Sequence, residues 1–298
     1  MPVRGTQSLV HMLSECWHRP DLLALELMWR WSFGIPALAL LVYEGTKVLA
    51  PAALRQAGLF DMSIQDPFTA AQVLSGAVGQ FLPPVLHIAR WLAPVLVAAW
   101  AISSGLGRSL VFRRLNKSMH FAPGTLIGLE FLRIASLLAA FFGWWFALRA
   151  AGASTLGHGD PNFVGYSAWV ICLSLGFFVL WALVSWIFSI APMIAMLEGA
   201  GITGSLGRSL RLGPLTGKLV EVNLVLSIVK LALLVLAMVF SAVPLPFSQS
   251  MTGTSLYLWW VGVSVVYLVA SDFFKIARLA AFTEFWRVYR GVLPVHAG

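Results

Sequence analysis

Long apolar runs separated by short polar stretches make up most of this chain. A helix needs roughly 20 apolar residues to cross about 30 Å of hydrocarbon, and several runs reach that length. We therefore expect an all-α polytopic bundle of six transmembrane helices, which forms one integral membrane domain over residues 1–298. The predicted spans cover about residues 22–43, 82–104, 124–148, 164–196, 219–243 and 256–270.

Three flanking segments have a different pattern. Residues 6–20 place apolar side chains at helical spacing beside polar ones, which predicts a helix lying on the cytoplasmic face. Residues 66–78 are consistent with a short interfacial helix on the outer side. Residues 271–298 are rich in Lys and Arg and are predicted to form a basic cytoplasmic tail.

Composition and charge support a membrane protein. Hydrophobic residues make up 59% of the chain and charged residues 11%, against about 25% charged in ordinary soluble domains. The predicted spans put fourteen Lys and Arg residues on one side of the membrane and four on the other. This asymmetry follows the positive-inside rule and predicts cytoplasmic N- and C-termini for a protein of the inner (cytoplasmic) membrane. It explains the +8 net charge better than nucleic-acid binding does.

One short motif occurs twice and indicates an internal repeat. Each copy follows an apolar run that contains Ala-Pro, and each precedes a run with an early glutamate. The motif Leu-Gly-Arg-Ser-Leu occupies 106–110 and 206–210, and the glutamates are Glu130 and Glu221. We expect three helical hairpins, each entered through a cytoplasmic elbow, with Ser8-Leu9 and Glu26 marking a weaker first copy. The alternative is that short Leu/Gly/Ser strings recur by chance.

The second elbow also resembles a known group of proteins. The residues that carry the resemblance are Pro192, Glu198, Gly199, Leu206, Arg208, Ser209, Leu210 and Leu212-Gly213. Their order is similar to that in six-span bacterial integral membrane proteins related to the membrane domain of glycerophosphodiester phosphodiesterases. The resemblance covers about Trp91 to Val243 and implies six helices and a link to membrane-lipid biology. It does not imply the phosphodiesterase activity, because this chain has no soluble catalytic domain.

Charged and polar residues inside the predicted spans are the first candidate site. Lys230 lies near the bilayer midplane, where a charge requires a partner or a wet cavity. Asn223, Ser227 and Lys230 share one face of their helix. The stripe is consistent with a substrate pathway or a headgroup pocket, or with a structural ion pair that holds helices together. The full candidate cluster is Glu130, Arg133, Glu221, Asn223, Ser227 and Lys230.

The charged groups of this cluster suggest particular pairs. Comparing depths at about 1.5 Å per residue predicts that Glu130 neutralises Lys230, with Glu221 as second choice. Glu130 with Arg133, and Glu26 with Arg30, are spaced to pair within their own helices.

The two elbows are the second candidate site. Arginine beside serine and main-chain amides can hold a phosphate, so the candidate contacts for an anionic headgroup are Arg108, Ser109, Arg208, Ser209 and Arg211. Arginine at a cytoplasmic helix end is also what topology alone requires.

No pattern indicates catalysis, a metal site or a cofactor. The six histidines are scattered, and Cys16 and Cys172 fall in different environments. Two function classes stay open: a non-enzymatic scaffold or lipid-interacting protein in envelope or lipid homeostasis, and a transporter or permease subunit that uses the Lys230 stripe. The expected partners are membrane lipids with anionic headgroups, and self-association or a membrane complex is left open.

Overall fold

A computed structural model describes residues 13–14, 16–58, 67–117, 119–157, 162–211, 215–242 and 253–292. The predicted interfacial helix at 6–20 lies mostly outside this part of the chain. The described residues form α2 (Pro20–Val48), α3 (Pro51–Gln56), α4 (Pro67–Leu115), α5 (Pro123–Leu156), α6 (Phe163–Glu198), α7 (Ile202–Ser209), α8 (Leu215–Ala242) and α9 (Thr254–Val292).

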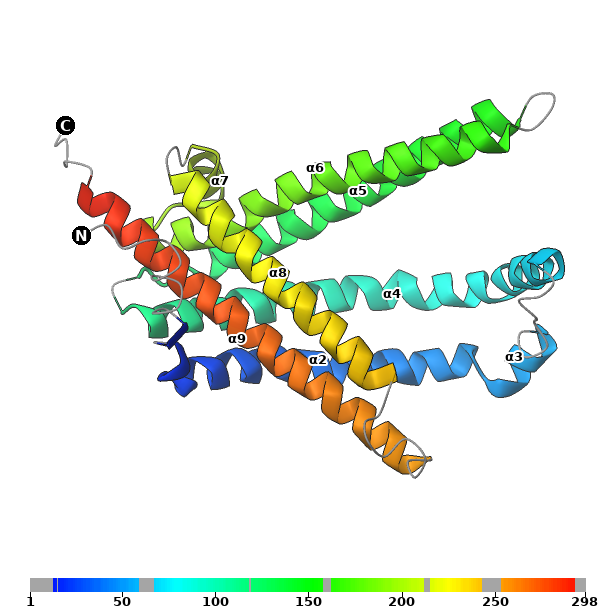
Figure 1. Ribbon diagram of the computed structural model, residues 1–298, viewed down its shortest axis with the longest axis horizontal. Helices are drawn as coiled ribbons and strands as arrows, with labels where there is room; N and C mark the ends of the chain where they lie inside the picture. The colour runs from blue at the N-terminus through cyan, green and yellow to red at the C-terminus, as the bar shows by residue number, and fades with distance from the viewer. Residues whose placement is uncertain are drawn as a thin grey trace.

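Six of these helices are long and apolar enough to cross a membrane, namely α2, α4, α5, α6, α8 and α9. This confirms the predicted all-α fold, and the protein is a multi-pass membrane protein. Three pairs of helices that follow one another in the chain pack together, α2 with α4, α5 with α6 and α8 with α9, and α4 packs on α5 as extensively as on α2. The start of α2 and the end of α9 lie at the same end of the molecule (Figure 1).

The three pairs converge at that end and splay apart toward the other (Figure 1). Neighbouring helices pack in the order α6, α5, α4, α2, α9, α8. Helices α6, α8 and α9, from the two ends of this series, contribute to a shared core around Met193, Leu226 and Phe282. Farther out, none of the apolar window of α6 is buried inside the protein. Exposed apolar surface of this kind is suited to contact with lipid.

Most helices continue beyond their predicted limits, and the largest differences are in α4 and α9. Residues 67–78 begin α4 and do not form a separate interfacial helix. Pro83 and Pro84 lie inside α4, and its first part is turned away from the rest (Figure 1), as expected where proline removes main-chain hydrogen bonds. Helix α9 does not stop at the predicted end of the sixth span, residue 270, but continues to Val292.

Candidate functional site: a basic cavity among five helices

A cavity of about 220 Å³ lies among α2, α4, α5, α6 and α9, near the converging end of the bundle. Aromatic side chains from α4, α6 and α9 form part of its wall. Its charged lining residues are Glu26 and Arg30 of α2, Arg108 of α4, Arg133 of α5, and Lys275 and Arg278 of α9. We refer to it as the basic cavity.

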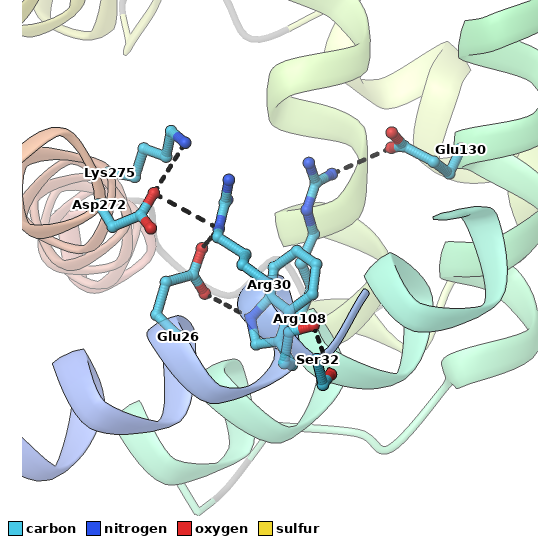
Figure 2. Close-up of polar contacts among 8 residues, drawn as sticks. Glu26, Arg30, Ser32, Arg108, Glu130, Asp272 and Lys275 are labelled. Atoms are coloured by element: carbon cyan, nitrogen blue, oxygen red, sulfur yellow. Dashed lines mark hydrogen bonds and ion pairs between the residues drawn. The ribbon is translucent and has the colours of Figure 1, made fainter. Parts of the chain in front are cut away.

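On one side of the cavity, a chain of charges joins α2 to α9. Glu26 is buried, accepts a hydrogen bond from the Trp29 indole at 2.8 Å and pairs with Arg30 one turn later. The Arg30 Nε also lies 3.6 Å from the Asp272 carboxylate, to which Lys275 donates at 2.8 Å (Figure 2). The predicted Glu26–Arg30 pair is confirmed, and its i, i+4 spacing follows from helical geometry.

On the other side, a single carboxylate joins α4 to α5. Glu130 is 4% exposed and accepts hydrogen bonds from the Trp100 indole at 2.9 Å and from Arg108 Nη1 at 3.2 Å. Arg133 Nη1 lies 3.5 Å from the same carboxylate, as the spacing within α5 predicted. Figure 2 shows Arg30 of α2 and Arg108 of α4 extending in the same direction, and both line the cavity.

Positive charge exceeds negative charge in this region. Five cations and one carboxylate line the cavity. Glu130 and Asp272 are not in the lining, but they form ion pairs with the lining cations Arg108 and Lys275. Charges interact strongly where water is scarce, so this arrangement favours an anion in the cavity. It disfavours a metal cation, and within the described residues no three His, Cys, Asp or Glu side chains are grouped to bind one.

On a bilayer centred on α5, the cavity would lie near the level of the lipid headgroups. Arg108 is about two helical turns, roughly 10 Å, from the end of α4, and Glu130 is about as far from the start of α5. At the same level, Met28 and Leu106 expose apolar side chains on the outer faces of α2 and α4. Helix α5 has 34 residues and is about 51 Å long, so it extends about 10 Å beyond each side of a 30 Å hydrocarbon layer on which it is centred.

The predicted pair of Lys230 with Glu130 is wrong. Lys230 is half-buried on α8, does not line the basic cavity, and makes no ion pair with any residue that the structure describes. Helix α8 packs mainly on α9 rather than on α5. The predicted depth in the membrane therefore does not bring Lys230 and Glu130 together. Arg108 and Arg133 neutralise the Glu130 carboxylate instead.

The structure separates the rest of the predicted intramembrane cluster. Arg133 reaches the basic cavity together with the Glu130 carboxylate behind it. On α8, the side chains of Glu221 and Ser227 are exposed, whereas the side chain of Asn223 lies outside the described residues. Of the stripe on α8, the described side chains of Ser227 and Lys230 do not line the cavity.

The two Leu-Gly-Arg-Ser-Leu motifs are helical and do not form the predicted turns. Residues 106–110 lie inside α4, and the second copy begins within α7. In both copies the serine is buried, and its hydroxyl donates a hydrogen bond to the carbonyl oxygen three residues earlier. The Oγ to carbonyl oxygen distance is 2.7 Å for Ser109 and 2.7 Å for Ser209. These hydroxyls donate to the backbone of their own helices, and neither serine lines the basic cavity.

The two elbow arginines have different surroundings. Arg108 faces the basic cavity, whereas Arg208 pairs with Glu198 at the end of α6. Arg211 is exposed and lies outside the cavity lining. Of the five predicted headgroup contacts, only Arg108 is therefore at the cavity.

Two charged cavity residues on α9, and the carboxylate that pairs with one of them, were not among the candidates, because they lie beyond the predicted end of the sixth span. Asp272, Lys275 and Arg278 are spaced by three residues and share one face of the helix. Apolar residues flank them, and Ile276 and Ala277 are buried. Acidic and basic residues at helical spacing within an apolar segment are the signal that would have identified them.

No known protein family, curated protein or solved structure was found to match this chain. The functional interpretation therefore depends on the basic cavity itself.

Proposed function

We propose that this protein binds the anionic headgroup of a membrane lipid in the basic cavity and acts in envelope or lipid homeostasis without a catalytic step. The observation that carries the proposal is the lining of five cations and one carboxylate. Burying this many charges at membrane depth is costly, and charged groups in such positions commonly mark binding sites or pathways. An anionic ligand would compensate for the excess.

The location favours a lipid over a soluble anion. On a bilayer centred on α5 the cavity would be near headgroup depth, and it is lined by both α6 and α9. These two helices do not pack along their length in the described part of the chain. A lipid can therefore approach from the membrane between them, with its headgroup in the cavity and its acyl chains against the exposed apolar faces of the splayed helices.

The cytoplasmic orientation belongs to the same proposal. The cavity lies at the end of the bundle where the predicted inner-face Lys and Arg residues gather, and the positive-inside rule places this end in the cytoplasm. Anionic lipids give the cytoplasmic leaflet a negative surface potential that attracts basic segments. The resemblance to six-span proteins linked with lipids agrees with this proposal. Transport through the Lys230 stripe gains no support, because neither Ser227 nor Lys230 lines the cavity.

Native mass spectrometry can test headgroup binding. The purified protein is incubated with equal amounts of phosphatidylglycerol and phosphatidylcholine of the same acyl composition. We expect retained phosphatidylglycerol to exceed phosphatidylcholine. Arg133→Gln should reduce this preference, because Arg133 lines the cavity while Glu130 keeps two other donors.

Arg114→Gln is the matched control. Arg114 is at the same end of the bundle but is 59% exposed and pairs with the exposed Asp21, so the same charge change leaves the cavity intact. Exposed pairs of this kind contribute little to stability. Two results would show that the cavity is not a headgroup site. One is equal retention of the two lipids by the wild-type protein. The other is an equal loss of lipid preference in Arg133→Gln and Arg114→Gln when the two variants have the same melting temperature.

A further inference from the structure

Two indole rings connect the carboxylates that hold the arginines of the basic cavity. We propose that Trp29 of α2 and Trp100 of α4 form a pair that positions Arg30 and Arg108 for the lipid headgroup. This inference rests on the proposed lipid-binding function and adds two positioning residues to it. Trp100 is part of the cavity wall, and Trp29 is buried next to it.

Trp29 acts on the first of these arginines through Glu26. The Trp29 Nε1 donates a hydrogen bond to one carboxylate oxygen of Glu26 at 2.8 Å, and the other oxygen pairs with Arg30. The guanidinium carbon of Arg30 also lies 4.7 Å from the centroid of the Trp29 ring. The hydrogen bond orients the carboxylate, and the attraction between the ring and the cation favours one position of the guanidinium. Trp29 therefore limits the directions in which Arg30 can point.

Trp100 acts on the second arginine through Glu130. The Trp100 Nε1 donates to Glu130 Oε1 at 2.9 Å, while Arg108 Nη1 donates to Oε2 of the same carboxylate at 3.2 Å. Water cannot easily replace the indole, because Glu130 is buried. A guanidinium has several N–H donors, so Arg108 can keep its ion pair through Nη1 and donate to a headgroup through the others.

The two indoles contact each other and thereby link the two arginines. The ring centroids of Trp29 and Trp100 are 5.8 Å apart, and Phe33 of α2 lies 5.3 Å from Trp100. Trp29 also packs against the backbone of α4 at Gly107, where a Cβ atom would come within 2.3 Å of the indole. Gly107 directly precedes Arg108 in the chain. The same ring therefore fixes the backbone that carries one arginine and the side chain of the other.

Trp100→Phe tests the proposal, because it keeps an aromatic ring beside Trp29 and removes the donor to Glu130. The assay titrates the purified protein with phosphatidylglycerol in detergent and measures the bound lipid by native mass spectrometry. We expect the dissociation constant to rise by up to about tenfold, which corresponds to one hydrogen bond to a charged group. An unchanged dissociation constant would contradict the proposal.

Trp144→Phe is the matched control. Trp144 of α5 donates its Nε1 to Ser174 Oγ of α6 at 3.1 Å, and neither residue lines the cavity. The substitution removes the same kind of hydrogen bond between two helices, so the dissociation constant of phosphatidylglycerol should not change. Equal weakening by Trp144→Phe and Trp100→Phe would show a general effect of losing an indole and would overturn the positioning role.

A double variant separates positioning from direct contact with the lipid. Glu130→Gln removes the charge that holds Arg108, although the glutamine oxygen can still accept a hydrogen bond from the indole. If Trp100 acts through Glu130, adding Trp100→Phe to Glu130→Gln should cause little further loss of affinity. Additive losses would indicate that the ring contacts the lipid itself, and the positioning role would be wrong.

The wild-type measurement separates this inference from the proposed function. Equal dissociation constants for phosphatidylglycerol and phosphatidylcholine in the wild-type protein would refute the headgroup site itself. If Trp100→Phe lowers the melting temperature, Trp29→Phe gives the same test from α2, with Glu26→Gln as its background. Selective binding by the wild type that both tryptophan variants retain in full would leave the headgroup site in place and refute the role of the indole pair.

Discussion

Replacing Glu130 by glutamine tests the ion pair that joins α4 to α5. The glutamine keeps the size of the side chain and an oxygen for the Trp100 indole, but it removes the negative charge that Arg108 and Arg133 share. The Arg133 side chain is 35% exposed and can turn toward water, whereas that of Arg108 is 21% exposed and belongs to the cavity wall. The main loss is therefore the counter-charge of Arg108.

The size of this effect follows from burial. Removing one partner of a buried ion pair costs about 3 to 5 kcal/mol. Because Arg133 can be hydrated and the hydrogen bond to the indole is kept, we expect a loss near the lower limit, about 3 kcal/mol in the free energy of unfolding. On the scale for domains of 150–250 residues, this corresponds to a fall in melting temperature of about 6 °C or more.

Thermal unfolding in detergent can measure the effect, and double variants identify the partner. Glu130→Gln combined with Arg108→Met should melt higher than Glu130→Gln alone, because the uncompensated cation is gone. Glu130→Gln combined with Lys230→Met should show no such recovery, because Lys230 makes no contact with the carboxylate. If the Lys230 combination recovers stability and the Arg108 combination does not, the pairing described here is incorrect.

Further predictions concern packing and topology. Gly107→Ala should destabilise the protein by about 1 to 3 kcal/mol, because the added methyl group would overlap the indole ring of Trp29 on α2. Gly34→Ala should be neutral or stabilising in the same thermal unfolding assay, because no atom lies near the added methyl group. Gly199→Ala should lower the melting temperature, because this helix-capping residue has a φ of 64°, and an unchanged value would argue against that cap. In intact cells, an impermeant thiol reagent added outside should label Ser154→Cys but not Lys117→Cys. The reverse labelling pattern would show that the predicted topology is inverted.

The sequence alone determined the elements and the pairs within them. Apolar runs of sufficient length specify spanning helices, because a backbone in lipid must satisfy its own hydrogen bonds. The predicted span at 164–196 accordingly agrees closely with α6 (Phe163–Glu198). Glu26 with Arg30, and Glu130 with Arg133, could be paired in advance because 3.6 residues per turn place them on one face of a helix.

Only the tertiary structure decided which helices share charges. The sixth span was predicted to end before its first charged residue, yet α9 continues through Asp272, where Arg30 of α2 supplies a counter-charge. Lys230 and Glu130 were paired from their depth in the membrane, but depth does not specify which helices are neighbours. Packing of α4 on α5 brings Arg108 to Glu130, while α8 packs mainly on α9. Contacts within a helix follow from its repeat, whereas contacts between helices depend on which faces pack together, and the linear order of residues does not contain that information directly.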